Sequence, residues 1–531
     1  MLSAGFVLFL SAAYLGLLFA VARFGDARAD AGKSIISANV YALSLAVYCT
    51  SWTFYGSVGR ATSGGLSFLT IYIGPTLMLL CVGVIIKMIR ISKAQRITSI
   101  ADFIASRYGK SQLLAGLVTV IAVIGVVPYI ALQLKAVSAS LQILFQTSGG
   151  GFLPGMIDST FIIAALLALF TILFGTRHLD ATEGMVAAIA FEAVVKLAAF
   201  LAVGVFVTYG MFGGLSDLFQ RAAASPELAR LLQMDSSRAE TWTALILLSG
   251  LAIIFLPRQF QIIVVENVDE AHLKRAVWLF PLYLVAINIF VLPLALGGLL
   301  HFQGQGFNPD TFVLTLPLAR GAESLALLVF IGGLSAATGM VIVETIALST
   351  MVCNDLVMPW LLRARWLGVG ERKDLSGVLL SIRRAAIILI LLLGYIYFRA
   401  AGEAYALVGI GLISFAAVAQ FAPAMFGGMY WKQGTRAGAV AGLLGGFFVW
   451  LYTLLLPSFA KSGWIANGFV EQGLWGIQAL KAQALFGLSG LDEISHSLWW
   501  SFLVNIGLYV LVSLYSKPDA VEAGQAERFV D

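Results

Sequence analysis

The sequence alternates between long apolar runs and short polar segments along its whole length. A helix that crosses a bilayer needs about 20 mainly apolar residues, and nearly all of the runs reach that length. The pattern therefore predicts an all-α polytopic membrane protein. The thirteen predicted transmembrane helices, of which only 159–174 is short, cover residues 3–22, 37–56, 66–87, 113–142, 159–174, 182–210, 242–258, 275–300, 323–357, 377–399, 404–427, 435–456 and 497–515.

Composition agrees with this pattern. Of the 531 residues, 60% are hydrophobic and 11% are charged, whereas a soluble domain is about 45–50% apolar and about 25% charged. Cys49, Cys81 and Cys353 have no metal-site spacing and suggest no disulfide framework, so we expect no cofactor beyond a coupling ion. The net charge of +5 is too small to suggest a nucleic-acid partner.

Lys and Arg are concentrated in the loops on one side of the predicted spans. Cytoplasmic loops of membrane proteins carry this excess. The bias predicts an N-terminus outside, a C-terminus in the cytoplasm, and an extracellular segment at 457–496.

The predicted span 37–56 changes character halfway. Residues 48–56 read YCTSWTFYG, which is rich in hydroxyls and aromatic rings, and Gly59, Gly64 and Gly65 follow. A helix that unwinds inside a membrane can offer backbone carbonyls and hydroxyls to a small ligand. The alternative is a tilted helix whose polar face packs on its neighbours.

The span 242–258 is interrupted as well. Its apolar run meets Pro257, Arg258 and Gln259 before it continues. Proline removes a backbone hydrogen bond and breaks a helix, and a cation and an amide stand at the break. The alternative is a span that ends at Pro257, with Arg258 at the cytoplasmic interface.

The two interrupted spans lie five spans apart. Two sets of five helices, each beginning with a broken one, are typical of an inverted-repeat transporter with one ligand site at the membrane midplane. Two further charges lie within one span, Glu192 and Lys196, four residues apart. We expect them to form a structural ion pair, although charges inside a membrane are often functional.

Several motifs resemble the sodium:solute symporter family. FAAVAQFAPAMFGGMYWKQGTRAGAVAGLLGG at 415–446 resembles the family signature near its C-terminal core helix. FLPRQFQIIVVENVDEAHLKR at 255–275 and SIADFIASRYG at 99–109 resemble two further family segments. The resemblance covers nearly the whole chain and implies thirteen spans with a LeuT-type 5+5 core.

Two segments resemble one branch more closely. YCTSWTFYGSVGRA at 48–61 and QAERFVD at 525–531 are similar to the transporter-like sensor domain of CbrA-type histidine kinases. This resemblance implies a bacterial inner (plasma) membrane protein that transports L-histidine and serves as the input module of a two-component system, with a cytoplasmic linker, kinase modules and a response regulator as partners. The chain itself shows no kinase motif, so we expect no enzyme activity from it.

The resemblance also implies a division of the chain into four parts. These are an extra N-terminal helix with an inner loop, an inverted-repeat core, two C-terminal helices with an extracellular segment, and a tail that begins a linker to kinase modules. Their bounds are 1–36, 37–427, 428–516 and 517–531.

The family's sodium site departs from its usual residues here. Members carry two neighbouring hydroxyl residues in the helix that corresponds to 323–357, and these positions fall on Gly339 and Met340. The oxygens that remain are the hydroxyls of Ser335 and Thr338 and the carbonyls of Ala46 and Cys49. Sodium prefers several oxygen ligands by analogy with other hard cations. We therefore favour a proton over sodium as the coupling ion, carried by Glu344 within the same helix; a buried structural carboxyl is the alternative.

A pocket between the two breaks would suit an amino acid, with unwound carbonyls for the ammonium and Arg258 or Gln259 for the carboxylate. A receptor with the same fold and little or no transport is the alternative function. The expected substrate-binding residues are Cys49, Thr50, Trp52, Thr53, Phe54, Tyr55, Tyr129, Gln133, Pro257, Arg258, Gln259, Ser414 and Gln420.

Overall fold

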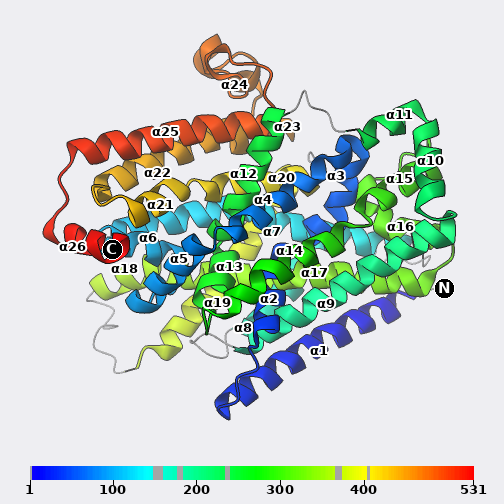
Figure 1. Ribbon diagram of the computed structural model, residues 1–531, viewed down its shortest axis with the longest axis horizontal. Helices are drawn as coiled ribbons and strands as arrows, with labels where there is room; N and C mark the ends of the chain where they lie inside the picture. The colour runs from blue at the N-terminus through cyan, green and yellow to red at the C-terminus, as the bar shows by residue number, and fades with distance from the viewer. Residues whose placement is uncertain (1–2, 148–158, 176–182, 234–238, 365–373, 403–406) are drawn as a thin grey trace.

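The protein is a bundle of helices packed side by side, as a computed structural model shows (Figure 1). The residues that the structure describes are 3–147, 159–175, 183–233, 239–364, 374–402 and 407–531, and none of these forms a strand. The first residues of two predicted spans, 182 and 404–406, lie outside this set. The prediction of an all-α polytopic protein is confirmed.

Within the described ranges, ten helical stretches are long and apolar enough to cross a membrane, and one bent pair makes an eleventh. Two shorter apolar helices, Ala38–Tyr48 and Phe161–Phe174, accompany them. The long helices are α1 (Ala4–Asp30), α7 (Gln112–Thr147), α9 (Glu183–Val205), α14 (His272–Asn288) with α15 (Val291–His301), α17 (Glu323–Met351), α19 (Ser376–Tyr397), α20 (Leu407–Ala419) with α21 (Ala422–Tyr430), α22 (Arg436–Trp450) and α25 (Glu493–Tyr515), and α8 (Ser159–Gly175) is shorter.

The span predicted at 37–56 is interrupted within the segment 48–56, where the sequence predicts unwinding. Cys49, with φ −80° and ψ 92°, is extended and stops the helix. A second departure lies at Gly65, whose φ of 53° is a conformation that glycine adopts at little cost. The elements of this region are α2 (Ala38–Ser44), η1 (Leu45–Tyr48), η2 (Trp52–Gly56), α3 (Ser57–Gly64), η3 (Gly65–Leu69), α4 (Thr70–Leu80) and α5 (Val82–Gln95).

The second interruption lies at the predicted place. Helix α12 (Ala239–Phe255) ends before Leu256, which is extended with ψ 130°, as a residue before proline prefers. Pro257 then begins α13 (Pro257–Phe260), and η7 (Gln261–Val265) follows. The two halves of this pair differ in direction by 56°.

Small residues let several helices approach closely. Gly438, Gly442 and Gly446 lie four residues apart on α22, and an added Cβ at each would press on α25. Gly74 of α4 meets α12 in the same way. Close backbone approach of this kind is how membrane helices associate without a hydrophobic driving force.

Short elements gather at the two ends of the bundle (Figure 1). The end near the N-terminus carries α10 (Leu215–Ala224), α11 (Pro226–Ala229) and α16 (Phe312–Ala319), together with η8 (Pro309–Thr311). The end near the C-terminus carries α6 (Ile100–Arg107), α18 (Met358–Arg363) and α26 (Ala520–Val530). The segment after α22 contains α23 (Leu456–Lys461) and α24 (Gly468–Glu471).

Candidate functional site

The two helix breaks meet in the centre of the bundle. Element η1, before the first break, contacts α13, which begins the second. Helix α17 contacts η1, η2 and α13. The chain therefore brings together two unwound segments and one continuous helix that runs past both.

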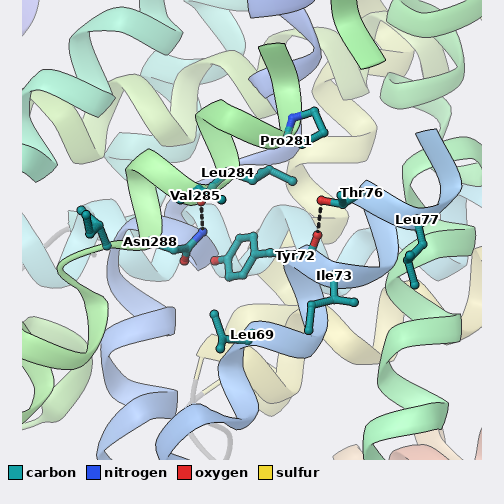
Figure 2. A pocket seen from close by; sticks show the side chains of 10 residues that line it. Leu69, Tyr72, Ile73, Thr76, Leu77, Pro281, Leu284, Val285 and Asn288 are labelled. Atoms are coloured by element: carbon teal, nitrogen blue, oxygen red, sulfur yellow. Dashed lines mark hydrogen bonds between the residues drawn. The ribbon is translucent and has the colours of Figure 1, made fainter. Parts of the chain in front are cut away.

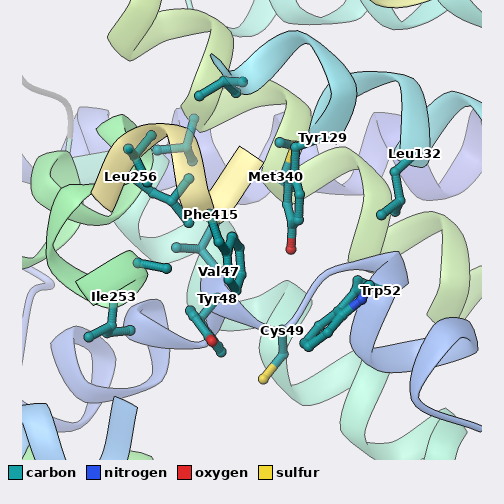
Figure 3. Packing of buried hydrophobic residues seen from close by; sticks show 14 of the residues in the cluster. Val47, Tyr48, Cys49, Trp52, Tyr129, Leu132, Ile253, Leu256, Met340 and Phe415 are labelled. Carbon is teal, nitrogen blue, oxygen red and sulfur yellow. The ribbon is translucent and has the colours of Figure 1, made fainter. Parts of the chain in front are cut away.

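A row of aromatic rings joins the two breaks. The ring of Trp52 lies 5.9 Å from that of Phe415, and Phe415 is stacked on Tyr129 at 5.7 Å. The guanidinium carbon of Arg258 lies 4.5 Å from the centre of the Tyr129 ring. Figure 3 shows Trp52, Phe415 and Tyr129 converging beside Cys49. A flat or cationic ligand would find aromatic faces along this row.

Arg258 is fully buried and paired with an acid. Its Nη1 donates to Oε2 of Glu344 at 2.5 Å, and neither side chain is exposed. Its other guanidinium nitrogens, Nε and Nη2, have no hydrogen-bond partner, and neither has Oε1 of Glu344. Because buried polar groups are rarely left unsatisfied, these atoms are able to bind a polar ligand. Arg258 does not lie at an interface with water.

Other polar atoms near the breaks are also unsatisfied. Both side-chain atoms of the Gln259 amide, the indole nitrogen of Trp52 and the Thr53 hydroxyl are buried without a hydrogen-bond partner. Pro257 is buried at the start of α13. Together with Arg258 and Glu344, these atoms offer both donors and acceptors within a few residues of the breaks.

Three predicted residues hold the first break in place. The Thr50 hydroxyl lies 2.9 Å from the Tyr129 hydroxyl. The Ser51 backbone N–H donates to Oε1 of Gln133 at 3.2 Å, and the Tyr129 N–H donates to the Ser414 hydroxyl at 3.1 Å. Helices α7 and α20 thus anchor the extended residues, so Thr50, Gln133 and Ser414 lie at the site in supporting positions.

The structure places three other predicted residues away from the break. Phe54 packs on Phe200 of α9 at 5.5 Å. Tyr55 lines a small pocket toward η8. The Gln420 amide donates to Ser501 of α25 at 2.8 Å. Alternate residues of η2 point in different directions, so an unbroken aromatic run cannot all face one ligand.

The predicted Glu192–Lys196 pair is wrong. The Lys196 ammonium donates to the carbonyl oxygens of Ala46 and Cys49, each at 2.7 Å. The Glu192 carboxylate instead accepts from the Thr338 hydroxyl at 2.6 Å. Two residues four apart on a helix can pair, but here the ammonium binds two backbone carbonyls at the break instead.

The hydroxyls of Ser335 and Thr338 both donate hydrogen bonds to Glu192. The Ser335 hydroxyl donates to the Glu192 backbone carbonyl at 3.0 Å. A Cβ at Gly339 would collide with the Glu192 carboxylate, and Met340 is buried. Among the described residues no group of three or more His, Cys, Asp or Glu side chains could hold a metal ion.

A large cavity lies elsewhere. It has a volume of about 390 Å³ and lies between α4 and α14 (Figure 2). Leu77, Val285 and Ile289 on its wall are exposed apolar residues, as expected of a surface that faces lipid. Tyr72 connects it to the site, because its ring lies 6.2 Å from Trp52.

An acidic residue closes the end of the bundle near the N-terminus. Asp310 of η8 accepts from the Leu407 N–H at 3.2 Å, and its carboxylate fills the space beside Gly59 of α3. Burial raises the pKa of Asp310 to about 6. Element η8 therefore links α3, which follows the first break, to α20.

Sequence reasoning missed Phe415 and misjudged Lys196. Phe415 is an apolar residue in an apolar run, and the signals that could have drawn attention to it are its neighbour Ser414 and its place at the start of the family-like motif at 415–446. Lys196 carried a clear signal, because a lysine inside a span is costly unless it has partners. The helical spacing to Glu192 concealed those partners.

Known proteins with similar sequences are symporters. No family model matches the chain. The chain is 24% identical to the uncharacterized symporter YodF of Bacillus subtilis (strain 168) over 443 residues. The aligned residues make up 81% of this chain and 80% of that protein. The chain is also 26% identical to the uncharacterized symporter YhjB of the same organism over 291 residues. The aligned residues make up 54% of this chain and 56% of that protein.

A solved structure shares the fold. The chain aligns with a Na+-coupled sialic acid symporter in its substrate-bound outward-open state with a TM-score of 0.68 and 15% sequence identity. The alignment covers 97% of this chain and 99% of that one. The protein is thus a multi-pass membrane protein with a transporter fold.

Proposed function

We propose that the chain is a secondary-active transporter of a small amino acid, L-histidine. The substrate lies between the two helix breaks. The single observation that carries this proposal is the buried cluster of unsatisfied donors and acceptors at Arg258, Gln259 and Trp52. The symporter relatives and the shared fold support it.

The proposed topology has thirteen transmembrane helices with a 5+5 inverted-repeat core in a bacterial plasma membrane. The N-terminus lies outside and the C-terminus lies in the cytoplasm. The distribution of Lys and Arg supports this orientation. The thirteen are α1, α2–α3, α4–α5, α7, α8, α9, α12–α13, α14–α15, α17, α19, α20–α21, α22 and α25.

The substrate's charged groups match the free atoms. Its carboxylate would bind Nε and Nη2 of Arg258, which form a fork suited to a carboxylate. The Cys49 carbonyl is committed to Lys196, so the ammonium would bind the Gln259 amide oxygen instead. The imidazole of histidine would stack in the aromatic row beside Trp52.

A proton would couple to this binding through Glu344. While Glu344 is ionised, its carboxylate holds Arg258. When Glu344 is protonated, Arg258 loses its charged partner and is free to bind the substrate carboxylate fully. Proton and substrate would therefore load together. Glu344 thus acts as the proton carrier, and the protein needs no sodium for this step.

Ligand-induced thermal stabilisation of the purified protein tests the proposal. Binding at a hundredfold excess over Kd stabilises the folded state by about 2.7 kcal/mol. Among the common amino acids, L-histidine should raise the melting temperature. Histamine, which lacks the carboxylate, and imidazole propionate, which lacks the ammonium, should not. A screen in which no amino acid raises the melting temperature would contradict the proposal.

A receptor function is the second candidate, and the C-terminal helix favours it. Phe529 of α26 packs on Phe103 of α6 at 5.4 Å, and Phe103 packs on Phe260 of α13 at 5.8 Å. Lys87 also donates to the carbonyl of Val530 at 2.7 Å. The tail is therefore two side chains away from the second break, so that binding there could be relayed to a linker and kinase modules.

A further inference from the structure

Lys196 occupies a special place at the first break. Its ammonium donates to the carbonyls of Ala46 and Cys49, both at 2.7 Å. These carbonyls stand where η1 ends and the chain becomes extended. The side chain is 3% exposed, so the positive charge lies among backbone dipoles with almost no contact with water.

We propose that the Lys196 ammonium is a tethered cation that fills a monovalent-cation site at the first helix break. The chain thereby supplies from α9 the charge that a sodium ion would supply to the same carbonyls. This inference rests on the proposed function only for its consequence, which is transport without sodium at this site.

Helix α17 leaves space for the acidic side chain that precedes Lys196 on α9. The Glu192 carboxylate, one turn before Lys196, occupies the space that Gly339 leaves on α17 and accepts from Thr338. A larger residue at 339 would displace it. Helix α9 therefore contributes a cation and an anion together, which limits the cost of burying either one.

Other ionisable groups around Lys196 and Glu192 come from five elements. Cys49 ends η1, Arg258 of α13 is neutralised by Glu344 of α17, and Tyr283 of α14 donates to the Ala193 carbonyl at 2.8 Å. Tyr14 of α1 faces Glu192. Glu192 is the acid nearest to the ammonium along α9, and the two carbonyls provide its hydrogen bonds.

Removal of the ammonium would leave the Ala46 and Cys49 carbonyls without their shared donor. These two oxygens, with the Glu192 carboxylate one helical turn away on α9, are ligands of the kind that hard cations prefer. Lys196→Ala should therefore create a sodium site. The variant should depend on sodium where the natural protein does not.

Melting temperatures in sodium chloride and in choline chloride, at equal ionic strength and pH, test this inference without any substrate. The natural protein should melt at the same temperature in both salts. Lys196→Ala should be destabilised in choline and should recover by several degrees in sodium. Lys432→Ala, which removes a half-exposed lysine that pairs with Asp531, should show no sodium-specific recovery.

Two different results would contradict the inference about Lys196. A folded Lys196→Ala protein that responds to sodium no more than the natural protein does would overturn the inference. So would a variant that is equally unfolded when it is purified in either salt. Because no amino acid is added, a sodium gain in Lys196→Ala would stand even if the amino-acid screen found no ligand, and the two proposals fail separately.

Discussion

Arg258 and Glu344 form a fully buried ion pair, with Nη1 and Oε2 2.5 Å apart. The pair ties α13, at the second break, to α17. Ion pairs inside a protein gain little net stability, because desolvation offsets the attraction. Arg258 also keeps two unsatisfied nitrogens, and Glu344 keeps one unsatisfied oxygen. We interpret the pair as a switch that exchanges its internal partner for a substrate.

Arg258→Ala should weaken L-histidine binding by about 2 kcal/mol or more, roughly 30-fold in Kd, because it removes a charged donor from a buried carboxylate. It should also lower the free energy of unfolding by about 3–5 kcal/mol, because Glu344 is left without its partner. Titration calorimetry and denaturation measure the two effects.

A double variant separates these effects. Arg258→Ala combined with Glu344→Ala should recover much of the stability, because no unpaired charge remains, but it should not recover binding. If Arg258→Ala binds L-histidine with unchanged affinity, Arg258 is a structural residue only.

Glu344→Gln should remove the response of uptake to an imposed pH gradient. The amide keeps the size of the side chain but cannot carry a proton, so Arg258 stays free of a charged partner. Equilibrium binding should persist and become insensitive to pH. Binding that keeps the pH profile of the natural protein would show that another group carries the proton.

The Asp310 contact should respond to pH. Burial raises the pKa of Asp310 to about 6 from its ordinary value of 3.8. A carboxyl with a raised pKa in the folded state favours that state in acid. The contribution of Asp310 is therefore largest below pH 3.8 and is lost as the pH rises through about 6.

The melting temperature of Asp310→Asn should accordingly fall less than that of the natural protein over this range. Asp217→Asn is the matched control at the same end of the bundle, because Asp217 is exposed and its pKa is lowered by Arg221. Parallel pH profiles for the natural protein and Asp310→Asn would rule out a role for this carboxyl.

Ligand binding at the second break should change the dynamics of α26, because Phe103 packs between the two. Hydrogen–deuterium exchange of residues 520–530 should change when L-histidine binds, because Phe103 contacts both Phe260 and Phe529. Phe103→Ala should abolish that change while binding persists. Phe448→Ala, at an exposed position of α22, is the control. If hydrogen–deuterium exchange of residues 520–530 does not change when L-histidine binds, the result would argue against the receptor function.

Local chemistry made parts of this structure predictable. Pro257 marks the second break, because it removes a backbone hydrogen bond and two polar residues follow it. Proline alone is not sufficient, since Pro128 stands inside α7 without ending it. The first break could be located only to within a few residues, because no single residue at 48–56 forces it. The partners of Lys196 could not be predicted, because they are backbone carbonyls on another helix and carry no sequence signal.

The same limit applies to the ligand site. Arg258 and Gln259 stand out as polar residues in an apolar span, and the structure places both at the breaks. Phe54 and Tyr55 share the composition of the site but point away from it, because side-chain direction in η2 depends on where the helix unwinds. Composition identifies a segment, and the backbone decides which of its side chains meet.

Uptake of radiolabelled L-histidine into proteoliposomes, driven by one gradient at a time, tests proton-coupled transport most directly. An inward proton gradient without sodium should drive accumulation in the natural protein and fail in Glu344→Gln. An inward sodium gradient at equal pH on both sides should drive none. Accumulation that requires sodium and ignores the proton gradient would contradict the proposed mechanism.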